Sequence, residues 1–113
     1  MYLVKNGVLY NSINAVEVVD TPPGVKVIAK EAFWREQRVV KAIINEGVEE
    51  IEEFAFGGCY NLAEVHLPQS LKRIHRKAFQ NCFAIRKVTG GSPNLVIEPG
   101  NDLLVDAMGR GGR

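Results

Sequence analysis

The residue types best suited to bind a metal are two cysteines and two histidines, in the order Cys59, His66, His75 and Cys82. Zinc takes such ligands in tetrahedral sites, and the sequence elements that hold it usually have C-x2-C or H-x3-H spacing. None of the intervals between these four residues has that spacing. We therefore predict no metal site.

Residues for catalysis are equally sparse. No Ser/His/Asp or Cys/His set and no cleft of paired carboxylates emerges from the sequence. Gly57-Gly58 and Gly90-Gly91 are not followed by a helical pattern, as a glycine-rich phosphate loop would be. We expect a non-enzymatic protein without a cofactor or a small-molecule substrate.

One basic run, "KRIHRKAF" at residues 72–79, has the composition of a polyanion-binding patch. The formal net charge of the chain is only +1, whereas nucleic-acid binders usually carry a marked basic excess. Whether the run binds nucleic acid depends on where its side chains point, which the repeats of the chain indicate.

Length and composition predict a single globular domain, since the chain has 113 residues, 46% of them hydrophobic and 24% charged. The N-terminus lacks the pattern of a signal peptide, and no segment approaches the roughly 20 apolar residues of a membrane span. Two cysteines are too few for a dense disulfide framework, so we expect reduced thiols. These features favour a cytoplasmic location without membrane contact, or an extracellular one if the chain is excised from a longer secreted protein.

The chain repeats itself with a period of 23 residues. Three series show the spacing without a slip: Ile28, Ile51 and Ile74; Phe33, Phe56 and Phe79; Ala32, Ala55 and Ala78. A fixed period of this length is typical of solenoid proteins. We predict three full repeats over residues 22–90.

The repeat resembles a known family. "VEEIEEFAFGGCYNLAEVHLP" closely matches the BspA type of bacterial leucine-rich repeat, although in the first repeat Glu36 replaces the cysteine and "VVKAII" replaces the second strand. The resemblance implies a leucine-rich-repeat solenoid, mostly β, with two short strands per coil. It also implies that Cys59 and Cys82 are small apolar residues of a loop ladder.

Caps are expected at both ends, because terminal coils would otherwise expose core and unpaired strand edges. Residues 1–21 contain two apolar runs around Asn6-Gly7, which predict an N-terminal hairpin. In residues 91–108, Ile97 follows Ile74 by 23 residues and Pro99-Gly100 marks a turn, so we predict a half-repeat and a hairpin cap. Residues 109–113 are expected to form a disordered tail.

Stacked coils place equivalent residues roughly 4.8 Å apart, so charges can be assigned to columns. Three columns alternate plus, minus, plus: Lys26, Glu49 and Lys72; Lys30, Glu53 and Arg76; Lys41, Glu64 and Lys87. Arg73 is predicted to face Glu50, which leaves chiefly Lys77 of the basic run without a carboxylate. The run is then mostly neutralised within the solenoid, which argues against nucleic acid.

Two surfaces are candidates for binding a partner. Trp34, Arg35 and Arg38 lie on the loop side of the first coil, and tryptophan and arginine are enriched at interface hot spots. Trp34 either belongs to such an interface, which we favour, or folds under the N-terminal hairpin. The second surface is the displayed sheet face, with Lys41, Ile43, Glu64, His66 and Lys87. Tyr60 and Phe83 are expected to stack and close the loop.

The sequence thus predicts a protein–protein interaction module with an unidentified protein partner, acting as an intracellular adaptor or inhibitor. A fragment of a secreted or surface adhesin and a nucleic-acid-binding protein are the alternatives. A homo-oligomer joined through a solenoid edge is a further arrangement that the fold permits.

Overall fold

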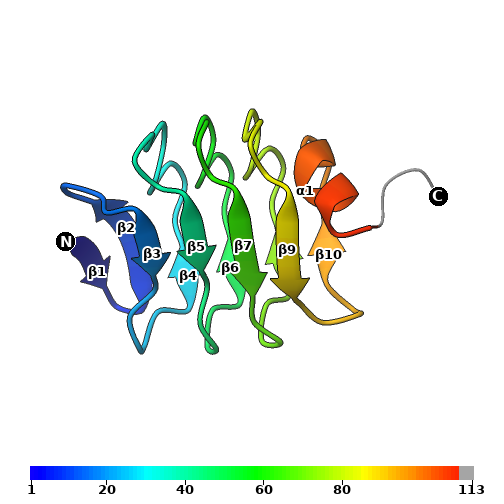
Figure 1. Cartoon of the computed structure of the whole chain (residues 1–113). Helices are drawn as coiled ribbons and strands as arrows, with labels where there is room; N and C mark the ends of the chain where they lie inside the picture. Colours follow the sequence, from blue (N-terminus) through cyan, green and yellow to red (C-terminus); the bar gives the residue numbers. More distant parts are fainter. Residues whose placement is uncertain (110–113) are drawn as a thin grey trace.

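Each coil of the chain contributes one short strand to each of two sheets, and the coils stack along one axis (Figure 1). The structure is a computed structural model, and it describes residues 1–109. Sheet A has the order β1-β2-β4-β6-β8-β10, with bounds Tyr2–Lys5, Val8–Ser12, Val27–Ile28, Glu50–Ile51, Arg73–Ile74 and Val96–Ile97. Sheet B has the order β3-β5-β7-β9, with bounds Val18–Asp20, Lys41–Ile43, Glu64–Leu67 and Lys87–Gly90. This architecture confirms the predicted mostly β solenoid with two short strands per coil.

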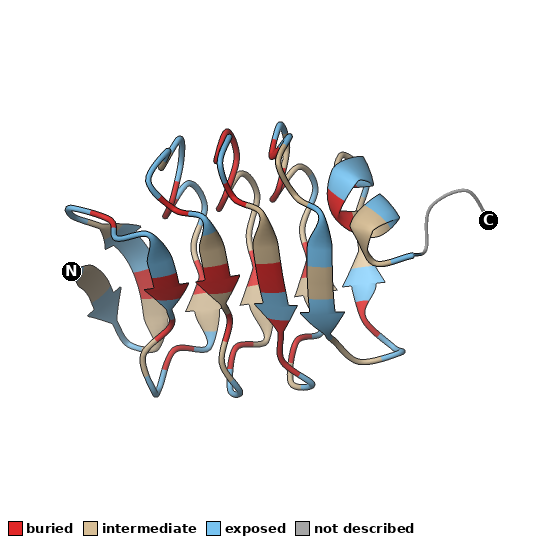
Figure 2. Ribbon diagram, in the orientation of Figure 1, coloured by how far each residue is buried: buried red, intermediate tan, exposed pale blue. Residues whose placement is uncertain are grey.

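The register is that of the 23-residue repeat. Ile28 pairs with Ile51 and Ile51 with Ile74 across parallel strands of sheet A. All three are fully buried, and Figure 2 shows that buried positions recur along the strands and loops of successive coils. The rings of Phe33, Phe56 and Phe79 stack in a ladder, with centroids 4.9 and 5.1 Å apart. The core is therefore a set of side-chain columns that pass from coil to coil.

The loops between the sheets use two left-handed backbone positions in each coil. One column contains Glu31, Phe54, Lys77 and Gly100, with φ values from 59° to 90°. The other contains Arg35, Gly58 and Asn81, with φ values from 58° to 71°. Left-handed backbone costs a residue with a side chain roughly 1–2 kcal/mol, so the stacking of identical turns must supply the energy that holds them.

The N-terminal hairpin is confirmed. β1 and β2 pair antiparallel around Asn6 and Gly7, whose φ values are 52° and 79°. The same region also forms a further coil, because β2 pairs in parallel with β4 and β3 with β5. Leu9 pairs with Ile28 across only 19 residues, since the loop between β2 and β3 is four residues shorter than the loops of later coils.

The predicted C-terminal hairpin is wrong, although the half-repeat before it is confirmed by the pairing of β10 with β8. After the turn at Gly100 the chain forms the helix α1, Asp102–Ala107. Leu104 is fully buried and Met108, four residues later, packs against the core, so one side of the helix covers the last coil. Within residues 1–109, no helix is long and apolar enough to cross a membrane. The predicted disordered tail begins at Gly109, and its residues 110–113 lie outside the described part.

Candidate functional site

The outer face of sheet B brings together all five residues of the predicted sheet surface. Ala42 and Val65 point into the core, so their strand neighbours point outward. These outward-pointing neighbours, together with Val65 beneath them, line a shallow hollow of about 200 Å³; they are Lys41, Ile43, Glu64, His66, Lys87 and Thr89. They are partners on neighbouring parallel strands and form two columns. One column contains Lys41, Glu64 and Lys87, and the other contains Ile43, His66 and Thr89.

The polar groups of this face largely pair with one another. Lys41 Nζ lies 3.8 Å from Glu64, and His66 Nδ1 lies 2.9 Å from Thr89 Oγ1. Lys87 lies opposite Glu64 in the register, as predicted, but the described ion pair of Glu64 with the third coil is the one with Arg86, at 3.9 Å. A face whose charges pair internally offers few unsatisfied groups to a ligand.

The second surface is the loop edge, which we define as the loops at residues 29–40, 52–63 and 75–86. Trp34 is 41% exposed and packs edge-on against Phe54 of the next coil, with ring centroids 5.5 Å apart. It occupies the space above Gly57, where an added Cβ would lie 2.6 Å from the indole Cζ3. The interpretation that Trp34 folds under the N-terminal hairpin is therefore wrong.

Two further aromatic side chains lie on this edge. Tyr60 and Phe83 stack with nearly parallel rings, at a centroid distance of 5.9 Å, which confirms the predicted pair. They remain 37% and 67% exposed. The sequence signalled the stacking through the 23-residue spacing but not this exposure. As a result, each of the three loops presents one aromatic side chain to solvent.

Arginines accompany the aromatic side chains in the first loop. The Arg35 guanidinium lies 5.7 Å from the centroid of the Trp34 ring, a cation–π geometry. Arg38 is exposed and lines a hollow with residues 14–17. Across residues 1–109, neither arginine has a carboxylate within ion-pair distance. The structure thus groups Trp34 with Arg35, while Arg38 faces the N-terminal coil.

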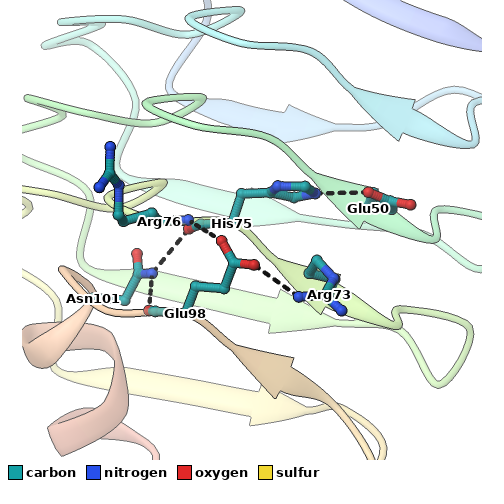
Figure 3. A network of polar contacts seen from close by, with 6 residues as sticks. All are labelled: Glu50, Arg73, His75, Arg76, Glu98 and Asn101. Atoms are coloured by element: carbon teal, nitrogen blue, oxygen red, sulfur yellow. Dashed lines mark hydrogen bonds and ion pairs between the residues drawn. The ribbon is translucent and has the colours of Figure 1, made fainter.

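Charged side chains on the outer face of sheet A form the network in Figure 3. Arg73 lies opposite Glu50 in the register, as predicted, but the two side chains form ion pairs with other residues. Arg73 Nη1 lies 2.7 Å from Glu98 Oε2, and Glu50 Oε1 lies 2.6 Å from His75 Nε2. The two backbones are in register at Glu50 and Arg73, but both side chains lean toward diagonal neighbours, which long side chains can reach.

The carboxyl group of Glu98 accepts two hydrogen bonds within this network. The hydrogen bond from Arg73, followed by the backbone N–H of Arg76, holds the pKa of Glu98 below its ordinary value. The carboxylate therefore links two residues of the third coil to the half-repeat after it.

The charge columns are confirmed in part. Glu53 contacts both Lys30 and Arg76, at 3.9 and 3.3 Å, as predicted. Glu49 contacts Lys72 at 3.7 Å, but the described ion pairs do not include one with Lys26. In the basic run, Lys72, Arg73, His75 and Arg76 each have a carboxylate partner, and Lys77 is absent from the described pairs. The run is mostly neutralised, as expected.

The cysteines are free, fully buried and held by the backbone. Cys59 Sγ donates to the carbonyl of Phe33 at 3.1 Å, and Cys82 Sγ to that of Phe56 at 3.0 Å. Burial raises the pKa of both thiols to about 12. Within the described residues, no three potential metal ligands come together; His66 lies in β7 of sheet B, whereas His75 directly follows β8 of sheet A.

Comparison with known families agrees with this geometry. The family model for the BspA type leucine-rich repeat region matches residues 3–100 in six copies. The chain belongs to this family. None of the curated proteins compared with the chain matches it. Leucine-rich-repeat proteins are in general non-enzymatic scaffolds that bind other proteins on their extended surfaces, so the family indicates a protein-interaction module.

Proposed function

We propose that this protein is an intracellular adaptor or inhibitor that binds another protein through the loop edge. One observation carries the proposal: three successive loops each expose an aromatic side chain, Trp34, Tyr60 and Phe83, on the same edge of the solenoid. Large exposed aromatic side chains gathered on one edge are typical of protein-binding surfaces rather than of solvated ones.

The aromatic side chains are held in place before any partner arrives. Trp34 is fixed by Phe54 on one side and by Arg35 on another, and Tyr60 and Phe83 stack on each other. Side chains that are already ordered lose less conformational entropy on binding, which favours affinity. Arg35 and Arg38 add positive charge beside Trp34, so the edge fits a partner segment with an apolar anchor next to acidic residues.

The sheet face is the less favourable surface for the same partner. Lys87 is exposed, but Lys41 and Glu64 are half-buried and pair with each other, and His66 pairs with Thr89. A ligand would have to replace these contacts with equally good ones. Among the described residues that line its hollow, only Ile43 and the inward-pointing Val65 are apolar.

An affinity pull-down from the native cell tests the proposal when it compares three baits. The wild-type chain should capture a protein that the variant Trp34→Ala and the variant Phe83→Ser both lose. A sheet-face variant, Lys41→Ala with Lys87→Ala, serves as the matched control and should retain that protein. If the partner is instead lost by the lysine variant and retained by the two aromatic variants, the binding site is the sheet face. A captured matrix or host-surface protein would favour an adhesin instead.

A further inference from the structure

The two ends of sheet B differ in how they are covered. At the C-terminal end α1 lies beside β9 (Figure 1). At the N-terminal end β3 pairs with β5 alone, and the described residues supply no strand on its other side. The edge of β3 is therefore an open strand edge, which proteins rarely leave uncovered without a use or a protective device.

The backbone of β3 shows which groups face outward. The carbonyl of Glu17 accepts from the N–H of Lys41 at 3.2 Å, and the N–H of Thr21 donates to the carbonyl of Ile43 at 3.1 Å. Because residues of a strand alternate between its two neighbours, the N–H and C=O of Val18 and Asp20 point away from β5. The open edge consequently offers a donor and an acceptor at Val18.

Tyr2 covers part of this edge. Its hydroxyl accepts a hydrogen bond from the N–H of Asp20 at 2.9 Å, while its ring packs edge-on against Phe33, 6.2 Å between centroids. The contact satisfies the Asp20 N–H in the absence of a neighbouring strand. The hydroxyl does not contact the backbone N–H or C=O of Val18, so Tyr2 covers only the part of the β3 edge at Asp20.

The side chains along the edge define the chemistry of a strand that could pair there. Val18 and Asp20 point to the outer face of sheet B, in the same columns as Lys41 and Ile43. Val18 is 41% exposed and its neighbour Val16 is 55% exposed. Among the described ion pairs, none involves Asp20 or Glu17, although the Asp20 carboxylate accepts a hydrogen bond from the Asn45 side-chain amide. The edge is thus apolar at its centre and acidic beside it.

We propose that the β3 edge is a second binding site, which accepts an extended segment of a partner protein as an added strand of sheet B. The segment places an apolar residue opposite Val18 and a lysine or arginine opposite Asp20, since opposite charges on facing strands attract. Main-chain hydrogen bonds at Val18 hold the strand, and displacement of the Tyr2 hydroxyl extends the pairing to Asp20. This site is separate from the loop edge and does not depend on it.

A second copy of the chain fits the edge less well. Two β3 strands in antiparallel pairing about Val18 would place each Asp20 opposite Val16 and would give neither carboxylate a cation. Both copies would also bring the acidic Glu17 and Asp20 to the same short interface. Charge complementarity therefore favours a basic segment from another protein.

The test is a titration followed by amide NMR, with a blocked peptide Lys-Thr-Val-Thr-Lys, whose symmetry allows either strand direction. The amide signals of Val18 and Asp20 should shift. The matched peptide Glu-Thr-Val-Thr-Glu should bind about fivefold more weakly or worse, from the charge contribution of a facing pair. Absence of shifts on β3 with either peptide would overturn the proposal.

Three variants separate edge pairing from other modes of binding. Val18→Pro removes the outward N–H but none of the bonds to β5, so it should abolish binding and preserve the fold. Tyr2→Phe removes the competing hydroxyl and should strengthen binding. Asp20→Lys should reverse the preference between the two peptides, which keeps the proposal testable if the proline variant fails to fold. Peptide binding that survives in Val18→Pro would contradict edge pairing. If the wild type forms concentration-dependent dimers and this variant does not, the edge binds a second copy of the chain instead.

Discussion

The side chain of Asn101 takes the place of a missing coil, because its Oδ1 accepts a hydrogen bond from the backbone N–H of Phe79 at 2.9 Å. In the two preceding coils the equivalent N–H groups, of Phe33 and Phe56, donate to the carbonyls of Ala55 and Ala78. The Nδ2 of Asn101 donates to the carbonyls of His75 and Glu98. One buried amide thus ends a ladder that would otherwise leave a buried donor without a partner.

Substitution of Asn101 by alanine should destabilise the protein by about 2 kcal/mol, since it leaves the buried N–H of Phe79 unsatisfied. Urea unfolding followed by circular dichroism measures the change. Asn61→Ala is the matched control, because the Asn61 amide also donates to a backbone carbonyl, that of Gln37, but at the surface. Equal losses in the two variants would contradict the special role of Asn101.

The acidic residues of the middle coil provide a second prediction. Glu53→Lys replaces two attractive contacts, with Lys30 and Arg76, by repulsive ones, whereas Glu49→Lys affects the single contact with Lys72. The loss in low salt should be about 1 kcal/mol for Glu53→Lys and smaller for Glu49→Lys, because these pairs are exposed. In 1 M salt the Debye length falls to about 3 Å and both losses should shrink. A loss that is independent of salt would show that it arises from packing.

Much of the fold could be predicted from residues such as Phe33, Phe56 and Phe79, because identical side chains at a fixed spacing reveal both the period and the register. The N-terminal coil was missed because its shorter loop changes the spacing from Leu9 to Ile28 to 19 residues. The helix α1 was missed because an apolar run such as Leu103 to Val105 fits a strand as well as a helix.

Side-chain direction was harder to predict than position. The 23-residue period places Arg73 beside Glu50, but it carries no information on the rotamer that takes Arg73 to Glu98. The orientation of Trp34 depends on the absence of a side chain at Gly57 in the next coil. Such contacts between unlike residues of different coils are not encoded in the repeat pattern, which is why the sites were predicted less completely than the fold.

Acid should weaken the link between Glu98 and Arg73. The pKa of Glu98 is lowered in the folded protein, so its contribution to stability is present above the ordinary value of 4.5 and is lost as the pH falls through the lower, folded pKa. Thermal unfolding between pH 6 and pH 2 should therefore depend less steeply on pH in Glu98→Gln than in the wild type. Identical slopes would show that Glu98 titrates normally. Asp106→Gln, at an exposed position of α1, is the control.

Cys59 and Cys82 should be unreactive in the native protein. Their pKa values of about 12 leave almost no thiolate at pH 8, and both side chains are fully buried. Ellman's reagent should modify neither thiol until urea unfolds the chain, and then both. Because the pKa of each thiol is raised from 9.0 in the folded protein, the protonated thiols contribute fully to the free energy of unfolding below pH 9. This contribution is lost as the pH rises toward 12. Rapid labelling of the folded protein would contradict the buried ladder.

The contact between Trp34 and Gly57 can be tested with the only tryptophan of the chain as its own reporter. In Gly57→Ala the new Cβ would lie 2.6 Å from Cζ3 and 2.9 Å from Cε3 of Trp34, so the ring must leave its place against Phe54. We expect a red shift of the tryptophan emission and a loss of about 1 kcal/mol in stability, at the low end of the cost of overpacking.

A double-mutant cycle then shows whether the two residues act on each other. If the alanine methyl harms the fold only through the indole, Gly57→Ala should cost about 1 kcal/mol in the wild type and almost nothing in the background Trp34→Ala, where the space above residue 57 is free. Urea unfolding of the four proteins gives the coupling energy. Equal costs in both backgrounds would mean that the backbone at Gly57, rather than the ring of Trp34, requires glycine. A coupling that accounts for the whole cost would establish that the second coil sets the position of the exposed tryptophan on the first.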